Sequence, residues 1–487
     1  MTLTRLPPVK TTLEPSNHPY MNGAWTPLHE EVDADDLQLI SGEIPKDIDG
    51  VYLRNTENPV HQPLGRYHPF DGDGMLHQIE FRNGRASYRN RFVRTRGFQA
   101  EQEAGGSLWG GLADPVQLAR RPGFGAHGSL KDSSSTDVVV HAGMVLSTFY
   151  QCGEGYRLDP LTLEPIGVEA WVPIDGISAH PKVDEHTGEL LFFNYSKHAP
   201  YMHLGLVGAD NRLKRYIPID VPGPRLPHDM AFTERFAILN DLPVFWDAKL
   251  LERNIHAVRL HEGLPSRFAL VPRSADGGPI RWFEASPTYV LHWLNAYDDG
   301  DEVVLDGYFQ DNPTPEPKRD AIPGFEHMMA YLDEHSFRPR LHRWRFNLVT
   351  GETKEERLCD EILEFGMING RYSGRKYRYG YSTVAEPGWF LFRGFVKHDL
   401  ETGGTERYML PPGVYASEAP FAPRVGATAE DDGYLVSFLI NEAAGTSECV
   451  LIDARKLAEG PVCRIALPHK ISSGTHAVWA PRDMLRG

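Results

Sequence analysis

The sequence predicts an all-β protein. Three observations support this: short apolar, strand-like runs recur along the whole chain, tight-turn signals join several of them, and helical periodicity is scarce. The 46 glycines and 38 prolines are spread over the full length. Such a distribution is typical of many short strands connected by tight turns.

The strand-like runs follow one another at short intervals. Turn signals lie at Asn83-Gly84, His186-Thr187-Gly188, Thr350-Gly351 and Thr402-Gly403-Gly404. Short helices are expected near Asp114–Arg120 and Asp247–Arg253. The expected strands include Asp137–Tyr150, Glu189–Tyr195, Phe236–Phe245, Glu302–Phe309, Leu341–Val349, Tyr377–Thr383, Trp389–Lys397, Tyr434–Ile440 and Cys449–Asp453.

The chain of 487 residues has no Ser/Gly-rich linker and no long run of charge. Its length alone would allow one large domain or about three ordinary ones. We therefore predict a single domain over residues 1–487, with residues 1–34 as an N-terminal extension. No internal repeat is evident in the sequence, so repeats do not define the architecture.

The net charge of −16 argues against a nucleic-acid partner, because binding DNA or RNA needs a basic surface. Residues 1–10 lack the layout of a signal peptide. No apolar run approaches the roughly 18 residues of a transmembrane helix. The four cysteines show no metal or disulfide spacing. We expect a cytoplasmic, reducing location and no transmembrane segment.

Four histidines stand in unlike settings at the borders of apolar runs. They are His180 in Ser178–Lys182, His228 in Leu226–Met230, His292 in Leu291–Tyr297 and His476 in Gly474–Trp479. Neutral imidazole is a ligand for iron, copper, zinc or nickel. With 21 histidines in the chain, each of the four is also explained as an ordinary hydrogen-bonded residue. Spacing alone leaves both interpretations open.

These four settings resemble those of the carotenoid cleavage oxygenase family, which includes apocarotenoid oxygenases, lignostilbene dioxygenases and the retinoid isomerase. Further family-like segments occur in the right order from about residue 35 to the end of the chain. They are Arg54–Pro59, Phe70–Met75, Arg281–Phe283, Glu364-Phe365, Ser417–Phe421 and Asp432–Tyr434.

The resemblance implies a seven-bladed β-propeller with non-haem Fe(II) on its axis, bound by the four histidines, and a loop and helix cap over the substrate entrance. The intervals of 48 and 64 residues between the first three histidines are compatible with blades of roughly 40–50 residues. The Pro-rich stretch Asn312–Gly324 is either an ordinary surface loop or part of that cap.

The resemblance also implies residues around the metal. Glu364 and Glu418 match family glutamates that orient ligating histidines, and both stand in apolar surroundings. A third family glutamate falls on Gln151, whose amide accepts a hydrogen bond without carrying charge, unless a one-residue gap hides the true match. Thr136 matches a threonine whose methyl group crowds one metal position, or it simply starts a strand.

Four neutral imidazoles leave a divalent iron with its full charge and up to two open positions in an octahedral frame. This suits O2 beside a neutral, apolar substrate. The resemblance therefore implies a dioxygenase that cleaves an alkene C=C bond with O2 to give two carbonyl products. A non-oxidative isomerase of the same family and a metal-free binding propeller remain alternatives.

The predicted substrate residues are Phe70, Leu112 and Tyr150. Leu112 and Tyr150 match the positions where lignostilbene dioxygenases hold the phenol of the substrate with Tyr and Lys, whereas Phe70 matches the phenylalanine that stacks on its ring. Because the phenol-binding pair is lost, we expect an extended polyene such as a carotenoid or apocarotenoid. A stilbene or a small vinyl phenol is the alternative. The sequence leaves the oligomeric state and the cleaved bond open.

Overall fold

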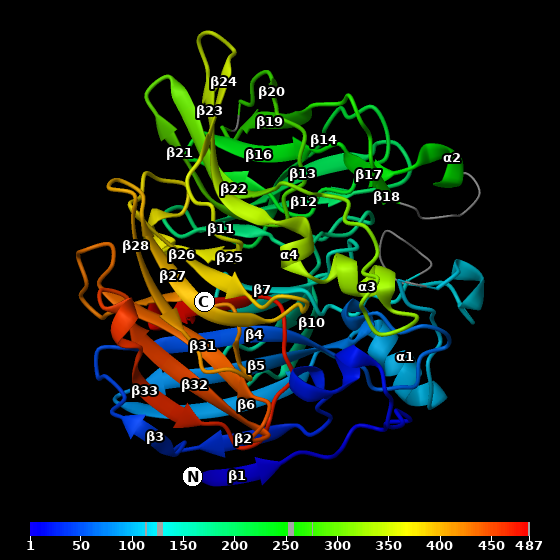
Figure 1. The fold of residues 1–487 in the computed structure, drawn as a ribbon, viewed down its shortest axis with the longest axis vertical. Helices are drawn as coiled ribbons and strands as arrows, with labels where there is room; N and C mark the ends of the chain where they lie inside the picture. The colour runs from blue at the N-terminus through cyan, green and yellow to red at the C-terminus, as the bar shows by residue number, and fades with distance from the viewer. Residues whose placement is uncertain (113, 124–129, 252–257, 275, 486–487) are drawn as a thin grey trace. The chain divides into compact units, whose positions relative to one another are not determined.

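The computed structural model describes residues 1–112, 114–123, 130–251, 258–274 and 276–485 (Figure 1). Within these ranges the chain is mostly β-strand, with four short α-helices, so the prediction of an all-β fold is confirmed. No helix in the described part of the chain is both long and apolar enough to cross a membrane. The α-helices are α1 (Arg96–Ala104), α2 (Ala248–Leu251), α3 (Glu326–Tyr331) and α4 (Glu334–Phe337).

The two predicted helices are reproduced only in part. The stretch Asp114–Arg120 contains a single 3-10 turn, η4 (Val116–Leu118), and Asp247–Arg253 contains α2, although its last two residues lie outside the described ranges. The cap predicted around Asn312–Gly324 stays a prediction. This segment directly precedes α3 and α4.

The chain forms two compact units. The first contains Met1–Val183, Val207–Leu213 and Leu410–Gly487, and the second contains Asp184–Leu206 and Lys214–Met409. The prediction of a single domain is not tested by this division and stays a prediction. The predicted N-terminal extension, residues 1–34, also stays a prediction; its strand Thr2–Arg5 and most of the strand Val32–Asp35 join the first sheet of the first unit.

Three antiparallel sheets lie in the first unit. The first has the order β1 (Thr2–Arg5), β2 (Val32–Asp35), β6 (Arg85–Phe92), β5 (Asp73–Arg82), β4 (Gly50–Asn58) and β34 (Ala477–Pro481). The second has the order β10 (Pro165–Val168), β9 (Tyr156–Leu158), β8 (Met144–Thr148) and β7 (Asp137–His141). In the third, β29 (Val414–Ala416) and β30 (Phe421–Pro423) both pair with β31 (Gly433–Asn441), followed by β32 (Thr446–Asp453), β33 (Pro461–Ala466) and β3 (Leu39–Gly42).

Strands from opposite ends of the chain pair twice within this unit. The C-terminal strand β34 lies antiparallel to β4, with Ala477 opposite Arg54. The N-terminal strand β3 completes the third sheet by pairing with β33. These pairings fix the position of His476, which immediately precedes β34.

Most residues of four further sheets belong to the second unit. Their strands follow chain order. The first contains β11 (Lys182–Asp184), β12 (Glu189–Tyr195), β13 (Met202–Val207) and β14 (Leu213–Pro218), and the second contains β15 (Ala231–Phe232), β16 (Phe236–Asp241), β19 (Ser266–Pro272) and β20 (Arg281–Ala285). The third contains β21 (Trp293–Asp299), β22 (Glu302–Gln310), β23 (Pro339–Asn347) and β24 (Thr353–Arg357). The fourth contains β25 (Leu363–Met367), β26 (Tyr379–Ala385), β27 (Phe392–Asp399) and β28 (Gly404–Met409). In the second sheet, β17 (Val244–Trp246) and β18 (Val258–Leu260) come between β16 and β19 in the sequence but pair only with each other.

Small antiparallel sheets built from consecutive strands are the blades of a β-propeller. The predicted turns connect their strands. Asn83 and Gly84 both have positive φ angles, +53° and +72°, as the tightest hairpin turn requires between β5 and β6. Gly188, Gly351 and Gly403 are likewise left-handed and lie in the predicted turns, which join β11 to β12, β23 to β24 and β27 to β28.

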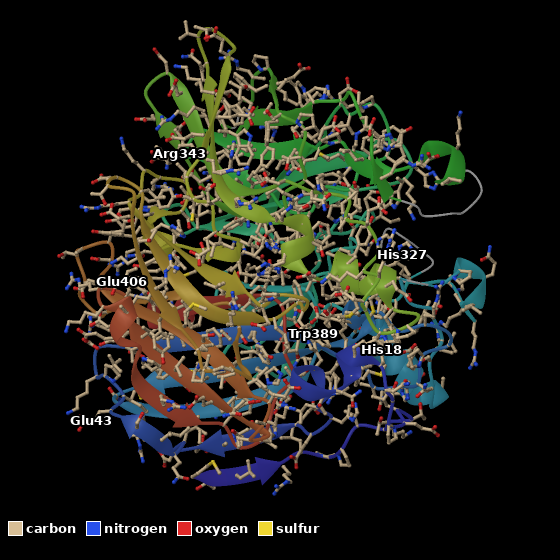
Figure 2. All side chains as sticks on the ribbon, in the orientation of Figure 1. His18, Glu43, His327, Arg343, Trp389 and Glu406 are labelled. Carbon is tan, nitrogen blue, oxygen red and sulfur yellow. The ribbon has the colours of Figure 1, made fainter. Side chains whose placement is uncertain are left out.

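The sheet that begins beside His292 is stabilised by a buried ionic network. Arg343 on β23, labelled in Figure 2, donates two hydrogen bonds of 2.8 Å to the fully buried carboxylate of Asp306 on β22. The Tyr377 hydroxyl donates a third over 2.7 Å. A buried carboxylate is costly unless such partners surround it.

We expect Arg343→Met to lower the free energy of unfolding by about 3–5 kcal/mol, because it leaves the Asp306 charge buried without its cation. Arg345→Met on the same strand is the matched control. Arg345 pairs with Asp299 and Glu302 at a partly exposed site, where an ion pair contributes about 0–1 kcal/mol. Urea denaturation of both variants measures this difference, and equal midpoints would contradict the expectation.

Candidate metal centre

Two of the four predicted histidines lie side by side in the first unit. The rings of His180 and His476 are buried and meet edge to face, with centroids 4.4 Å apart. His476 is placed by strand pairing, since the Asn55 N–H donates to its carbonyl oxygen over 2.9 Å. His180 instead has a left-handed backbone, with φ at +64°, which is uncommon for a residue other than glycine.

The carboxylate of Glu418 contacts His476. Its Oε2 atom lies 3.4 Å from His476 Nδ1 and accepts the main-chain N–H of Ala477 over 2.5 Å. Burial raises the pKa of Glu418, and the adjacent His476 opposes this shift. The side chain therefore sits where the resemblance implies an orienting glutamate.

The family-like segment that begins at Arg54 supports this contact from β4. Arg54 is fully buried and donates hydrogen bonds to Ser417 Oγ over 2.5 Å and to the Ser472 carbonyl over 2.6 Å. Burial lowers the pKa of Arg54 to about 10, which leaves the guanidinium charged at neutral pH. One side chain thus joins the residue before Glu418 to the segment that leads to His476.

His180 has a carboxylate neighbour that the sequence analysis did not identify. Asp137 Oδ2 accepts the main-chain N–H of His180 over 3.0 Å and lies 3.4 Å from its Nδ1 atom. Asp137 Oδ1 accepts the N–H of Val138 over 2.7 Å. Asp137 therefore holds the left-handed backbone of His180 and contacts its ring.

The other two predicted histidines lie together in the second unit. The rings of His228 and His292 have centroids 5.2 Å apart. Asp229, next to His228, accepts the N–H of Trp293, next to His292, over 3.0 Å, and its carbonyl accepts the side-chain amide of Asn240 over 2.7 Å. Asp229 thus ties the loop that carries His228 to the start of β21.

Glu364 contacts His292 at the shortest of these distances. Its Oε2 atom lies 2.7 Å from His292 Nδ1 and accepts the main-chain N–H of Phe365 over 2.9 Å. The pairing of β25 with β26 is irregular between Glu364 and Met367, and Phe365 has a left-handed φ of +51°. A β-bulge re-aims side chains in this way. Glu364 is fully buried, as the sequence analysis expects.

The four histidines form one group. The imidazole nitrogens that His180, His228, His292 and His476 offer as ligand atoms all lie within 4.8 Å of one another. The carboxylates at Nδ1 of His292 and His476 favour a proton there, which leaves Nε2 of each ring as the ligand atom. The residues therefore fit a metal that prefers imidazole, such as iron, copper, zinc or nickel.

Thr136 is buried beside this group. Its carbonyl oxygen accepts the hydroxyl of Thr475 over 2.7 Å, and its own hydroxyl oxygen accepts the N–H of Tyr150 over 3.3 Å. Thr475 precedes His476, so Thr136 connects the predicted substrate residue Tyr150 to a predicted metal ligand. Gln151 lies in the turn after β8 and is partly exposed. The roles of Thr136 and Gln151 stay predictions.

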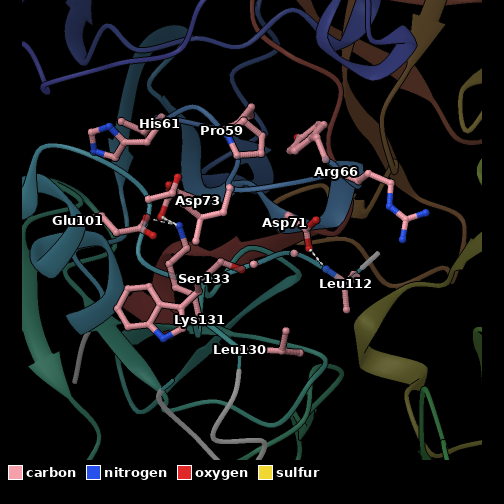
Figure 3. Close-up of a pocket in the computed structure, with 18 of the residues that line it drawn as sticks. Pro59, His61, Arg66, Asp71, Asp73, Glu101, Leu112, Leu130, Lys131 and Ser133 are labelled. Carbon is pink, nitrogen blue, oxygen red and sulfur yellow. Dashed lines mark hydrogen bonds and ion pairs between the residues drawn. The ribbon is translucent and has the colours of Figure 1, made fainter. Parts of the chain in front are cut away.

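The three predicted substrate residues lie in the first unit, and contacts join them. The rings of Phe70 and Tyr150 meet edge to face at 6.3 Å, and Leu112 donates its N–H over 2.8 Å to Asp71, the neighbour of Phe70. Leu112 lines a cavity together with Trp109 and Phe149 (Figure 3). Among the described residues that line this cavity there is none of the four histidines.

A buried ionic triad lies at the same cavity. Lys131 Nζ is 2.9 Å from Asp73 Oδ1 and 2.8 Å from Glu101 Oε2, as the dashed lines in Figure 3 show. Although burial alone would lower the pKa of Lys131, its two carboxylate partners raise it. The lysine is thus a cation whose charge is already neutralised within the protein.

The fold and the site together define a sheet-built protein with four imidazoles that fit a metal ion. A sequence profile described as retinal pigment epithelial membrane protein matches residues 25–481. A carotenoid 9,10(9',10')-cleavage dioxygenase 1 of Pisum sativum is 31% identical, and the match covers 96% of this chain and 91% of that protein.

Solved structures agree with these sequence matches. The lignostilbene dioxygenase of Pseudomonas brassicacearum superposes with a TM-score of 0.83 at 27% identity, over 96% of this chain and 100% of that one. A cobalt-substituted apocarotenoid oxygenase of Synechocystis superposes with a TM-score of 0.80 at 26% identity, over 93% and 97% of the two chains. The chain belongs to the retinal pigment epithelial membrane protein family, which contains the carotenoid cleavage oxygenases. This confirms the predicted seven-bladed β-propeller and the predicted class of enzyme, a carotenoid-cleavage-type oxygenase.

Sequence reasoning missed Asp137 and Asp229. Asp229 directly follows a predicted ligand, so its position in Leu226–Met230 was an available signal. Asp137 directly follows Thr136 but is 43 residues from the histidine that it contacts. Only the fold brings Asp137 and His180 together.

We expect Glu364→Gln and Glu418→Gln each to lower metal affinity or turnover by roughly 10–100-fold, because a neutral amide orients imidazole less strongly and makes it less basic. Glu361→Gln is a control close to Glu364, on a partly exposed side chain that pairs with Arg407. Metal titration and steady-state kinetics measure the effect. Wild-type behaviour of both variants would show that neither glutamate acts on the metal.

Proposed function

We propose that this protein binds one Fe(II) through His180, His228, His292 and His476 and uses O2 to cleave a C=C bond of a carotenoid or apocarotenoid. In the balanced reaction the carbon–carbon double bond is broken and each oxygen atom of O2 ends in one of two carbonyl products. The observation that carries this proposal is the group of four imidazoles within 4.8 Å.

The donor set supports iron. When bound, iron supplies the redox chemistry that lets O2 react with a closed-shell alkene. The four neutral imidazoles add no charge at the centre, and the surrounding carboxylates contact the rings rather than replacing them as ligands. The cobalt-substituted relative fits a site of this type, since cobalt and iron share imidazole ligands.

We expect purified protein to hold close to one iron per chain. Alanine at any of the four histidines should abolish both iron binding and cleavage, because three imidazoles remain where four hold the metal. His186→Ala is the matched control, since His186 is exposed and bonds the Arg371 carbonyl over 2.8 Å. Metal analysis by mass spectrometry reads out the result. Zinc as the native metal, or full activity of one ligand variant, would reject the iron proposal.

The surroundings of the predicted substrate residues favour an extended apolar substrate. Phe70, Leu112 and Tyr150 offer aromatic and aliphatic surface, and burying apolar area contributes about 25 cal/mol per Å². Lys131, which lines the cavity together with Leu112, already binds Asp73 and Glu101. A lysine held in this way does not replace the phenol-binding lysine of the lignostilbene dioxygenases.

We expect catalysis to depend little on a free 4-hydroxyl group of the substrate. An apocarotenal should be cleaved at least as well as a 4-hydroxystilbene, and methylating that hydroxyl should change kcat/KM less than about tenfold. A site built to read a hydroxyl would discriminate by about 10⁴-fold or more. Tyr150→Phe tests whether Tyr150 binds a phenol of the substrate, because it removes the hydroxyl and keeps the ring against Phe70.

The alternative substrates give opposite results in this comparison. If methylation lowers kcat/KM by about 100-fold or more and the apocarotenal is not cleaved, the substrate is a stilbene or a vinyl phenol. A matching loss of kcat/KM in Tyr150→Phe would identify Tyr150 as the residue that binds the phenol. Labelled O2 separates the oxygenase from a non-oxidative isomerase, because only the oxygenase places label in two carbonyl products.

The cytoplasmic location is also proposed, and cell fractionation tests it.

A further inference from the structure

Two carboxylates of the site share one pattern of contacts. In each, a single oxygen atom lies against the Nδ1 atom of a metal-ligand histidine and also accepts a main-chain N–H. Glu364 Oε2 does so with His292 and the Phe365 N–H, and Glu418 Oε2 with His476 and the Ala477 N–H.

Asp137 repeats this pattern at a third histidine. Its Oδ2 atom lies 3.4 Å from His180 Nδ1, which equals the Glu418 to His476 distance, and accepts the His180 N–H over 3.0 Å. The exposed fraction of Asp137 is 7%, compared with 5% for Glu418. The three carboxylates are thus all buried, face the same ring atom and accept a main-chain N–H, while Glu364 lies closer to its histidine, at 2.7 Å.

We propose that Asp137 is a positioning residue for the metal and acts through His180 as a third outer carboxylate. This inference rests on the proposed iron site. It also answers a question that the sequence analysis leaves open, because Gln151 carries no charge at the position matched to a family glutamate. Asp137 supplies a negative charge from strand β7 to His180, a histidine without a predicted partner.

The physical consequence is twofold. A carboxylate at Nδ1 fixes the proton there, so Nε2 of His180 is presented to the metal, and it increases the basicity of the ring. Its negative charge also favours Fe(III) over Fe(II). Both effects need the charge of Asp137 and not merely an acceptor for the main chain.

The competing explanation is that Asp137 only holds the loop, since it accepts the N–H groups of Val138 and His180. Asp132 provides a matched control five residues earlier. It is equally buried and accepts two main-chain N–H groups, from Ser134 over 3.1 Å and from Glu154 over 2.6 Å. Within the described part of the chain these main-chain groups, and not an imidazole, are its hydrogen-bond partners, so Asp132 serves the loop without contacting a predicted ligand.

The experiment compares Asp137→Asn with Asp132→Asn and Glu418→Gln in the full chain. For Asp137→Asn we expect Fe(II) affinity to fall about tenfold or more, as for Glu418→Gln. The Fe(III)/Fe(II) potential should rise, and a tenfold loss of preference for Fe(III) corresponds to about 59 mV. The visible spectrum of the Co(II)-loaded protein should shift as well. Asp132→Asn should leave affinity, potential and spectrum at wild-type values.

The outcomes separate this inference from the proposed function. If wild-type protein binds no iron, the proposed function fails. Wild type and Glu418→Gln could behave as expected while Asp137→Asn matches Asp132→Asn in affinity, potential and spectrum. Asp137 would then only hold the loop, and the inference would be overturned. Should Asp137→Asn not fold without metal, Asp137→Ser takes its place, because serine also accepts nearby main-chain N–H groups and carries no charge.

Discussion

The architecture of this site depends on a carboxylate oxygen that is shared between an imidazole and a main-chain amide. A buried carboxylate is costly unless hydrogen bonds surround it, so neither contact is stable without the other. At Glu364 and Glu418 the amide belongs to a strand residue, Phe365 inside β25 or Ala477 at the start of β34. The orientation of the ring and the register of the strand therefore depend on each other. A change in either would leave a buried carboxylate without one of its partners.

The sheets carry buried polar residues that would be unfavourable if neighbouring segments did not bind them. Strand β4 is buried along its whole length, yet it carries Arg54, Asn55 and Glu57. Arg54 and Asn55 bond groups around Ser417, Ser134 and His476, so the polar residues serve neighbouring segments rather than their own strand. The left-handed residues His180 and Phe365 have the same origin. Each adopts an uncommon backbone conformation beside a carboxylate that accepts its N–H.

Much of this structure could be predicted from local sequence, and the failures have a common cause. Strands and hairpin turns were predictable because alternation and Asn-Gly or Thr-Gly pairs act over a few residues. Helix α1 was not, because its sequence RGFQAEQEA buries little apolar surface and gives no helical stripe. The four histidines were found through family resemblance. Asp137 was not, because an aspartate at the start of a strand has an ordinary local role, and its partner His180 is distant in sequence.

The surroundings of the predicted substrate residues offer no unpaired charge among the side chains discussed above. Lys131 is neutralised by Asp73 and Glu101, and the rings of Phe70 and Tyr150 pack against each other. Discrimination at such a surface relies on shape, and one methylene in an apolar pocket changes kcat/KM only by about 10–200-fold. Tyr150 is also linked through Thr136 and Thr475 to the residue before His476. A substitution that widens this surface at Tyr150 is therefore expected to disturb the predicted metal ligand His476 as well, through Thr136 and Thr475.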